Sequence, residues 1–328
     1  VAAAQALDLY TLENGLAAQE IDGVIGITTD VLEDLLRLSG PVTAQGITFT
    51  PENVIEKLEY EVEYGYQKRG IPVGERKQIM TELMQTIMQR LGANAVTRFK
   101  DYVDLAYRLA AERHIMLYSP EPSLQAKISA LDWDATMTTT SLDYLWWIDA
   151  NLTALKTDHA LQRSLRYQVA PRADGRLVAT VTMNYKHTGV FDWRTTRYRS
   201  YTRVFVPIGA ELVGVTGDAK AKNTSVEQGI ELGRQWFGTF IQIEPGDTRA
   251  LTFSYVLPSS ITEDVKSGKY TLGVQKQAGT GAHGLTLHLD FGKNITSAQP
   301  GEDQKNWGNA VYDFTTDLRL DRAFTIGL

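Results

Sequence analysis

Strict alternation of apolar and polar residues runs through much of the sequence after residue 131. In residues 177–185, LVATVTMNY, every second side chain is apolar or aromatic. Because side chains alternate between the two faces of a β-strand, such a segment predicts a strand that buries one face. Similar segments recur, separated by turn residues such as those at 173–175 and 245–247. The pattern predicts an antiparallel β-sandwich of immunoglobulin-like type over residues 132–328.

The first 131 residues follow a different pattern, in which helical signals and short apolar runs alternate. Residues 2–19 are rich in Ala and Leu and predict a helix, and apolar residues repeat at helical spacing from Ile79 to Leu91. Residues 21–27, IDGVIGI, predict a buried strand, and residues 114–119, HIMLYS, predict a second strand. We therefore expect an α+β protein of two domains, with a mixed α/β layer domain over residues 1–131.

Length and charge agree with two domains. A chain of 328 residues exceeds the usual size of one hydrophobic core. Residues 1–130 hold 12 Lys/Arg against 18 Asp/Glu, a net charge of -6, whereas residues 131–328 hold 21 against 21. Since nucleic-acid binding usually needs a basic surface, we expect no nucleic-acid partner.

The chain has no cysteine, which excludes disulfides, Cys-ligated metal sites and thiol catalysis. This composition is compatible with the cytoplasm or with a bacterial surface. No apolar run approaches the 18 residues of a membrane-spanning helix. The sequence begins with Val1 rather than Met, so we expect any signal peptide or membrane anchor to lie in an upstream segment absent from this chain.

The sequence contains no recognisable catalytic or cofactor-binding motif. Residues 279–284 formally match G-x-G-x-x-G, but a strand pattern follows where a dinucleotide site needs a helix, so we expect a hairpin loop there. His187, His283 and His288 have no spacing that brings metal ligands together, and we interpret them as surface or loop residues. We expect no cofactor, no metal and no catalytic residue, which favours a non-catalytic role for this chain alone.

Three arginines alternate along one predicted strand. Arg197, Arg199 and Arg203 fall on one face, with Tyr201 between them. Because guanidinium groups bind carboxylates and phosphates with two parallel hydrogen bonds, this strip is a candidate binding site for a phosphate, an acidic glycan or an acidic protein. The alternative is a solvated outer face on which the arginines pair with acids of neighbouring strands.

A second candidate site surrounds the break in the helical pattern at residues 70–74, GIPVG. Arg69, Arg76 and Gln78 lie beside this break. Arg76 would lie in the first turn of the following helix, where free backbone N–H groups add to an anion site. The alternative is an ordinary charged helix start.

The adjacent tryptophans Trp146 and Trp147 lie in a predicted strand. Trp146 aligns with Tyr144 and Ile148 on one face, and Trp147 aligns with the opposite face. The two rings therefore form no flat ligand platform unless a bulge breaks the alternation. We expect one tryptophan to enter the sandwich core and the other to cover the seam between the two domains.

Five blocks resemble, in order, a bacterial family known as domain of unknown function 4012, and together they cover most of the chain. The blocks are IDGVIGITTDVLEDLLRLSGPV, DYLWWIDANLTALKTD, YRSYTRVFVPIGAEL, WFGTFIQIEPGDTRALTFSYVLP and YDFTTDLRLDRAF. Members of that family typically begin with a membrane segment and a glycine-rich block with Asn, Glu and Arg, which this chain lacks. The resemblance implies an extracytoplasmic protein, anchored on its N-terminal side, with no established activity.

The first domain is also similar to the C-terminal half of the LytR-CpsA-Psr enzymes, which transfer glycopolymers from a polyprenyl-pyrophosphate carrier to the cell wall. IDGVIGI, GPV and Arg76-Lys77-Gln78 before a long amphipathic helix carry this similarity. Arginines hold the pyrophosphate in those enzymes, so the resemblance implies this role for Arg69 and Arg76. The N-terminal half of that fold, with its Asp and further Arg residues, is missing from this chain.

Two functions from different classes follow. The first is an extracytoplasmic or cell-surface protein with a structural, assembly or adhesion role, whose partners are further copies of itself, other envelope proteins or a cell-wall glycopolymer. The second is a glycopolymer transferase or polyprenyl-pyrophosphate-binding protein that acts together with a missing N-terminal segment. In both, the chain meets a membrane only through a segment that it lacks.

Overall fold

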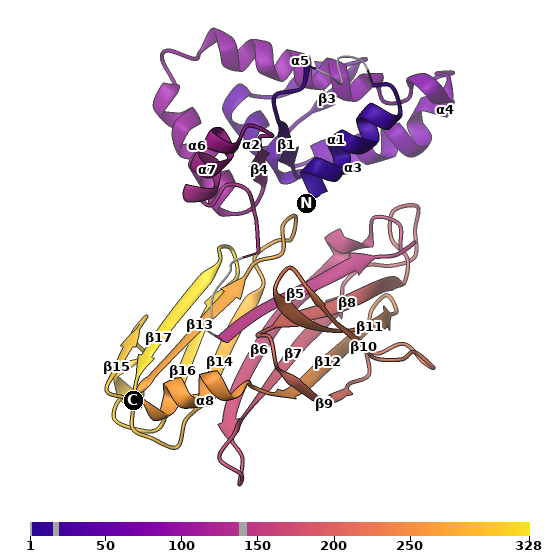
Figure 1. Ribbon diagram of the computed structural model, residues 1–328. Coiled ribbons are helices and arrows are strands. Elements are labelled where there is room, and N and C mark those ends of the chain that lie inside the picture. Colours follow the sequence, from indigo (N-terminus) through magenta and orange to yellow (C-terminus); the bar gives the residue numbers. More distant parts are fainter. Residues whose placement is uncertain (1, 16–19, 138–142) are drawn as a thin grey trace. The chain divides into compact units, whose positions relative to one another are not determined.

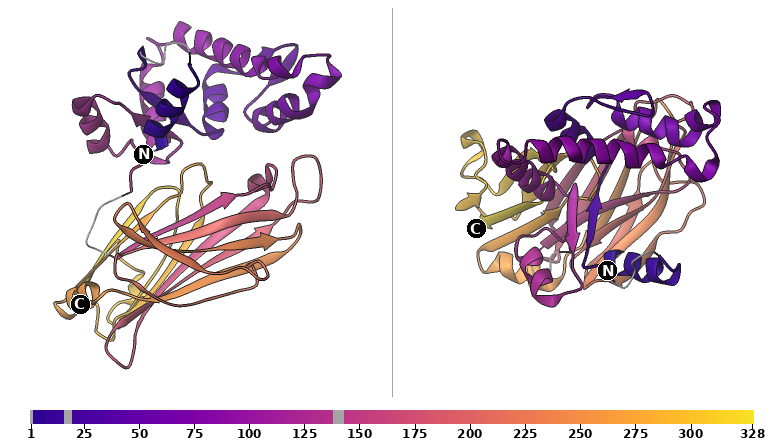
Figure 2. Two further views of the ribbon diagram at one scale, coloured as in Figure 1. Left: turned by 45° about the vertical axis from the view of Figure 1, so that its right-hand side comes forward. Right: turned by 90° about the horizontal axis from the view of Figure 1, so that it is seen from above.

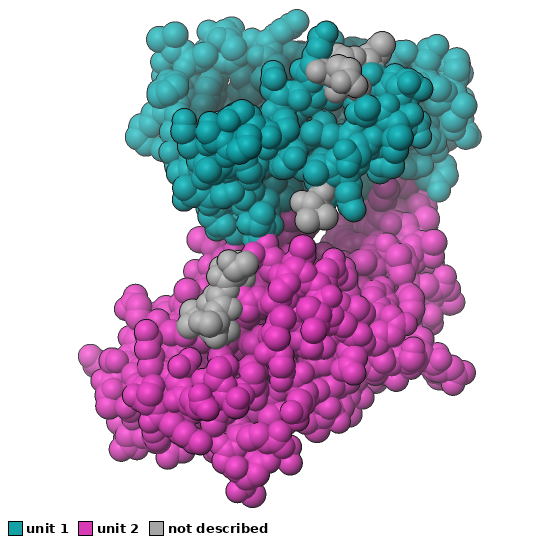
Figure 3. Space-filling view, in the orientation of Figure 1, with its two compact units in different colours: residues 1–136 teal, residues 137–328 magenta. Residues whose placement is uncertain are grey.

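The computed structural model describes residues 2–15, 20–137 and 143–328. The protein is mixed α/β with two multi-stranded sheets. The chain divides into two compact units, residues 1–136 (unit 1) and residues 137–328 (unit 2), coloured teal and magenta in Figure 3. The domain boundary after residue 131, drawn from the sequence, stays a prediction.

Unit 1 is mostly helical. Its strands form two small antiparallel pairs, β1 with β4 and β2 with β3. In chain order the elements are α1 (Ala2–Leu12), β1 (Val24–Ile27), α2 (Asp30–Ser39), β2 (Val42–Ala44), β3 (Ile47–Phe49), α3 (Val54–Tyr60), the π-helical turn η2 (Glu61–Gly65), α4 (Tyr66–Lys68), the 3-10 turn η3 (Val73–Glu75), α5 (Gln78–Ala93), α6 (Phe99–Ala111), β4 (Ile115–Tyr118) and α7 (Pro122–Ala130).

Helix α5 supplies much of the unit 1 core. Ile79, Leu83, Ile87 and Leu91 are buried, as their helical spacing predicts. They form a single cluster with side chains from α2, β2, β3 and α3. The predicted helix over residues 2–19 is present up to Leu12, and its last residues, 16–19, lie outside the described part of the chain.

The predicted strands at 21–27 and 114–119 are present as β1 and β4, but the prediction that β1 is buried is wrong. Ile25 and Ile27 are exposed. The continuous apolar run suggested a strand covered on both faces, as in a parallel sheet. Instead β1 and β4 form a two-stranded sheet in the described part of the chain, and such a sheet leaves the alternate side chains of one face uncovered.

Unit 2 consists mainly of strands (Figure 1). The seven-stranded sheet has the order β10-β11-β8-β5-β13-β17-β15, and the six-stranded sheet has the order β16-β14-β6-β7-β12-β9. The strands are β5 (Asp143–Asn151), β6 (Leu161–Pro171), β7 (Leu177–His187), β8 (Tyr198–Val206), β9 (Glu211–Thr216), β10 (Glu227–Glu231), β11 (Arg234–Ile243), β12 (Thr248–Val256), β13 (Lys269–Gln275), β14 (Gly284–Asp290), β15 (Ser297–Gln299), β16 (Val311–Asp317) and β17 (Arg322–Gly327). Three short helices complete the unit: η4 (Thr157–Ala160), α8 (Ser259–Lys266) and η5 (Gln304–Asn306).

Two strand pairs contradict the prediction of an antiparallel arrangement throughout. β13 runs parallel to β5, and β14 runs parallel to β6. The partners lie more than one hundred residues apart in the sequence, so no local turn signal could indicate their direction. Parallel neighbours need a long crossover connection, whereas the prediction assumed hairpins between successive strands.

The two sheets lie in two layers (Figure 2) and share one hydrophobic core. Alternate residues of β7, from Leu177 to Tyr185, are buried in it, as their two-residue period predicts. The seven-stranded sheet contributes Trp147, Val204 and Phe237 to the same cluster.

The two tryptophans point to opposite faces of β5. Trp147 is 4% exposed and packs edge-on against Phe253, with ring centroids 5.6 Å apart. Trp146 lies on the other face of the sheet beside Phe205, at 5.5 Å between ring centroids. The prediction that one tryptophan enters the core is confirmed. The role expected for the other, covering a seam between domains, stays a prediction.

None of the helices in the described ranges is long and apolar enough to cross a membrane.

Candidate functional site

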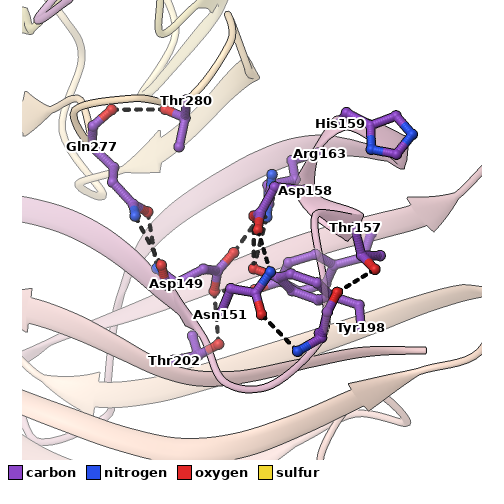
Figure 4. Close-up of polar contacts among 12 residues, drawn as sticks. Asp149, Asn151, Thr157, Asp158, His159, Arg163, Tyr198, Thr202, Gln277 and Thr280 are labelled. Carbon is purple, nitrogen blue, oxygen red and sulfur yellow. Dashed lines mark hydrogen bonds and ion pairs between the residues drawn. The ribbon is translucent and has the colours of Figure 1, made fainter. Parts of the chain in front are cut away.

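Polar side chains of β5, β6, β8 and the connection from β13 to β14 form a cluster in unit 2 (Figure 4). Its centre is an ion pair between Asp149 of β5 and Arg163 of β6, with 3.1 Å between Oδ2 and Nε. The two side chains are only 2% and 5% exposed. Because β5 and β6 belong to different sheets, this ion pair joins the two layers across the core.

Asp149 receives hydrogen bonds from three further side chains. Tyr185 and Thr202 donate to Oδ1 at 2.9 and 2.7 Å, and the indole N–H of Trp147 reaches the same oxygen at 3.2 Å. A buried carboxylate is stable only when its lone pairs are satisfied, and here four donors surround it. The lone pairs of this carboxylate are therefore engaged by donors of unit 2 itself.

Arg163 also reaches the rim of unit 2. It donates to Asp158 at 2.9 Å and to the Tyr198 hydroxyl at 2.8 Å. Asn151 donates to the second oxygen of Asp158 at 2.7 Å and thereby fixes the loop between β5 and η4. Burial raises the pKa of Tyr198, so this phenol remains protonated and can donate at neutral pH.

The connection from β13 to β14 contacts the same cluster. The Gln277 side chain accepts from the backbone N–H of Asp149 at 2.9 Å and donates to its carbonyl at 2.8 Å. The pairing of β13 with β5 ends at Gln275 and Trp146. The two hydrogen bonds of Gln277 extend the contact along β5 as far as Asp149. Lys276 and Thr280 bind carbonyls within the connection itself.

His283 ends this connection and is largely buried. Burial lowers its pKa to about 3, and the positive charges of Arg163 and Lys276 act in the same direction. Its Nε2 atom has no hydrogen-bond partner among the described residues. A general base works best with a pKa near the operating pH, so a neutral imidazole this weakly basic is poorly suited to proton transfer.

A second buried carboxylate lies at the start of β5. Asp143 accepts from the hydroxyls of Tyr167 at 2.7 Å and of Tyr270, and from the backbone N–H of Tyr144 at 2.8 Å. Burial raises the pKa of Asp143 to about 6, although these hydrogen bonds oppose the shift. Tyr167 and Asp143 again come from different sheets, so this cluster also joins the two layers.

Neither cluster was predicted from the sequence, yet both leave a signal in it. Asp143 and Asp149 are in phase with Leu145 and Trp147 on the buried face of β5, and Arg163 is in phase with the buried residues of β6. A charged residue at a position where the alternation requires an apolar one indicates a buried ion pair or hydrogen-bond network.

Of the predicted basic strip, Arg199 and Arg203 lie on the outer face of β8, and Arg197 directly precedes this strand. Arg197 pairs with Glu244 at 3.1 Å, and Arg203 pairs with Glu231 at 2.9 Å. Arg199 is exposed and has no acidic partner among the described residues. Two of the three arginines thus have cross-strand acids, as the alternative interpretation of this strip expects.

The second predicted site does not gather its three residues around one point. Arg69 pairs with Glu61 of the π-helical turn at 2.8 Å and donates to Gln45 at 3.0 Å. The Arg76 guanidinium lies over the ring of Tyr66, 5.9 Å from its centroid, and Gln78 is exposed at the start of α5. Of the three, only Arg76 keeps a partly exposed cation without an acidic partner in the described chain.

Two predictions about the histidines and the glycine-rich segment are wrong. His187 is neither a surface nor a loop residue, because it ends β7 on the buried face and its Nε2 contacts the carbonyl of Thr196 at 2.9 Å. Residues 279–284 do not form a hairpin, because the connection joins β13 of one sheet to β14 of the other. The strand predicted after this segment is confirmed as β14.

His288 is on β14 and pairs with Asp313 at 2.8 Å. No group of three or more His, Asp or Glu in the described ranges is arranged to hold a metal ion.

Unit 1 contains an apolar pocket of about 350 Å³. It lies among α2, α5, α6 and β4, and only one of its lining side chains, Tyr102, carries a polar group. The lining residues are Leu35, Leu38, Met88, Leu91, Gly92, Ala95, Tyr102, Leu105, Ala106, Leu109 and Ile115. Such a lining suits an apolar ligand better than a charged one.

No protein-family model matches the chain, and no curated protein matches its sequence. Among solved structures, it is similar to a proposed nutrient-binding protein from Legionella pneumophila, with a TM-score of 0.33, 7% identity and coverage of 56% of this chain and 71% of that chain. It is also similar to native leukotriene A4 hydrolase from Saccharomyces cerevisiae, with a TM-score of 0.31, 7% identity and coverage of 54% of this chain and 30% of that chain.

A zinc metallopeptidase of the M1 class from Deinococcus radiodurans gives a TM-score of 0.22, 10% identity and coverage of 54% and 43%. The chain thus spans less than half of either enzyme. Similarity this low carries no argument about the activity of this protein.

Proposed function

We propose that this chain belongs to an extracytoplasmic protein of the bacterial cell envelope or cell surface, and that unit 2 is a β-sandwich used for assembly or adhesion. The resemblance of five sequence blocks to domain of unknown function 4012 supports the location. The proposed immunoglobulin-like type would be an enlarged one, since the two sheets hold thirteen strands against the usual seven to nine.

The observation that carries the proposal is the open side of the two sheets. β10 ends the seven-stranded sheet and β9 ends the six-stranded sheet, and a groove of about 760 Å³ lies between them. The apolar side chain of Ile230, which lines this groove, is exposed. Unpaired sheet edges with exposed apolar residues are surfaces on which other chains assemble.

The two buried carboxylate clusters support the same role. Both contain a hydrogen-bonded carboxylate that contacts the opposite sheet, and both carboxylates are buried away from solvent. A rigid pair of sheets presents its edges and faces in a fixed geometry, which favours recognition over catalysis as the function of unit 2.

Co-sedimentation with purified envelope fractions tests the proposal. The purified chain is mixed with cell-wall and membrane preparations of the native host and centrifuged. We expect saturable recovery in the pellet with at least one fraction. Complete recovery in the supernatant with both fractions would contradict an adhesive or assembly role.

A second candidate function is binding of a polyprenyl pyrophosphate by unit 1, as part of a glycopolymer transferase. The apolar pocket favours it, together with the partly exposed Arg76. Arg76 lies two residues before α5, and Met88 lies ten residues beyond the first residue of this helix, about 15 Å along its axis, a distance that a long isoprenoid chain can span. Binding of a fluorescent polyprenyl pyrophosphate that is equal in Arg76→Ala and in the unchanged chain would exclude this function.

A further inference from the structure

The groove at the open side of unit 2 has the features of a strand-binding site. Residues of β9, β10 and β11 line it together with the residue before β9: Ala210, Glu211, Leu212, Gln228, Gly229, Ile230 and Gln235. Within the described ranges, β10 pairs only with β11, and β9 pairs only with β12. Each therefore has one edge whose backbone N–H and C=O groups take no part in a ladder, and only an extended chain can pair with such an edge along its length.

The side chains of β10 divide into two sets. Gln228 lies opposite Phe237, which is buried in the core, so Gln228 and Ile230 face inward and line the groove. Ile230 is nevertheless 66% exposed, because no strand lies beyond β10 to cover it. A strand added to this edge would place every second side chain in the groove, beside Ile230 and Leu212.

The other set faces outward and is acidic. Glu231 pairs with Arg203 at 2.9 Å, whereas Glu227 accepts from the neutral hydroxyl of Tyr201 at 2.6 Å and so keeps its net charge. Burial, together with the Glu227 contact, raises the pKa of Tyr201 to about 12, so this hydroxyl remains a donor. The outward face of an added strand would therefore be stabilised most by a basic side chain opposite Glu227.

We propose that this groove binds an extended strand of a partner protein, which pairs with β10, inserts apolar side chains between the sheets and presents Lys or Arg opposite Glu227. The inference rests on the proposed assembly role and names the surface and the kind of partner. A second copy of the chain fits poorly. Antiparallel pairing of two β10 strands centred on Gly229 places Glu227 of each copy opposite Glu231 of the other, and like charges directly opposite destabilise a sheet.

A labelled peptide that reproduces this pattern tests the proposal: acetyl-Thr-Lys-Val-Thr-Val-Lys-Thr-amide, measured by fluorescence anisotropy with the whole chain. We expect saturable binding with a Kd below about 1 mM. A peptide with Pro at the central position loses a backbone donor, and one with Glu in place of both Lys residues opposes the charge pattern. Both should bind at least tenfold more weakly.

The variant Ile230→Lys should also weaken binding at least tenfold, because an inward-pointing charge blocks the groove. Val213→Lys is the matched control. It places the same charge at an exposed valine of the other edge strand that does not line the groove, and it should bind the peptide like the unchanged chain. Bound peptide should slow amide hydrogen exchange at residues 227–231.

Three results would overturn the inference: no binding of the Lys-Val peptide, equal binding of the Pro peptide, or unchanged hydrogen exchange at residues 227–231. Dimerisation of the chain through β10, detected by sedimentation and abolished by Ile230→Lys, would also overturn it in favour of a second copy. If the peptide fails while the chain still sediments with envelope fractions, only the strand-binding surface is wrong. If neither binds, the proposed function fails as well.

Discussion

Asp149 and Arg163 form a buried ion pair in unit 2. Burial of an ion pair contributes little net stability compared with apolar residues of the same size, but removal of one partner leaves the other charge uncompensated. Asp149 would keep three donors without Arg163 and still lose its counter-ion. The pair therefore fixes how the two sheets meet more than it adds to the free energy of unfolding.

Arg163→Ala should lower the free energy of unfolding of unit 2 by about 3–5 kcal/mol, because it leaves the Asp149 carboxylate buried without its cation. Arg166→Ala is the control, since Arg166 is on the same strand but points to the exposed face. Its effect should stay within about 0.5 kcal/mol. Denaturant unfolding followed by tryptophan fluorescence measures both. Equal losses in the two variants would contradict a structural role for the ion pair.

Asp143 should make unit 2 less stable as the pH rises from about 4 to about 6. Its folded pKa of about 6 lies above the unfolded value of 3.8, so the folded state binds the proton more tightly. The associated stability is present below the unfolded pKa and is lost as the pH rises through the folded pKa. A shift of this size corresponds to roughly 3 kcal/mol.

Asp143→Asn removes this titration. The difference in unfolding free energy between the unchanged chain and this variant should therefore decrease from pH 4 to pH 6.5. Measuring the difference cancels the carboxylates that titrate in both proteins. A difference that stays constant over this range would show that Asp143 is not a buried carboxyl with a raised pKa.

At the scale of elements, the sequence predicted those buried faces that follow from a regular spacing of apolar residues along one segment. β7 and α5 appear with their expected buried faces, because periods of 2 and 3.6 residues reflect side-chain geometry directly. The parallel pairs β5–β13 and β6–β14 were not predicted, since they join segments more than one hundred residues apart. The connection over residues 276–283 was misassigned for the same reason, because its glycines suit a hairpin as well as a crossing between sheets.

In the candidate sites, too, a local pattern predicted some features, whereas others depend on contacts between distant segments. The alternation predicted that Arg199 and Arg203 share the outer face of β8, and Arg197 directly precedes this strand. Their partners Glu244 and Glu231 lie at or near other strands, and only the fold brings them close. The groove beside β10 could not be predicted, because it depends on which strands end the two sheets.

The end of β9 depends on a glycine. Gly217 has φ +117, and a Cβ there would lie 2.2 Å from the carbonyl oxygen of Ala250. Gly217→Ala should lower the free energy of unfolding by about 2–3 kcal/mol, since strain and a backbone clash act together. Gly214→Ala, on the same strand but in open space, should change it by less than about 1 kcal/mol. Thermal unfolding compares the two, and equal effects would contradict this difference.

At the scale of the whole molecule, the two units have separate hydrophobic clusters and different compositions. Those clusters, one in each unit, share no residue. The entire net charge of -6 comes from residues 1–130. Separate cores allow separate folding, because each unit can bury its own apolar surface.

Residues 132–328 alone should therefore fold. We expect a cooperative thermal transition and near-ultraviolet circular dichroism from Trp147, which packs inside the unit 2 core. The fragment should also keep the pH response that depends on Asp143. A fragment without a cooperative transition would mean that unit 2 requires residues 1–131.

The absence of cysteine allows a direct test of the proposed location. Ala173→Cys places one thiol in the exposed turn between β6 and β7, and Val181→Cys places one in the core as a control. Intact cells of the native host that produce each variant are treated with a membrane-impermeant maleimide. An extracytoplasmic protein predicts labelling of Ala173→Cys before lysis and no labelling of Val181→Cys. Labelling of Ala173→Cys only after lysis would contradict an envelope or surface location.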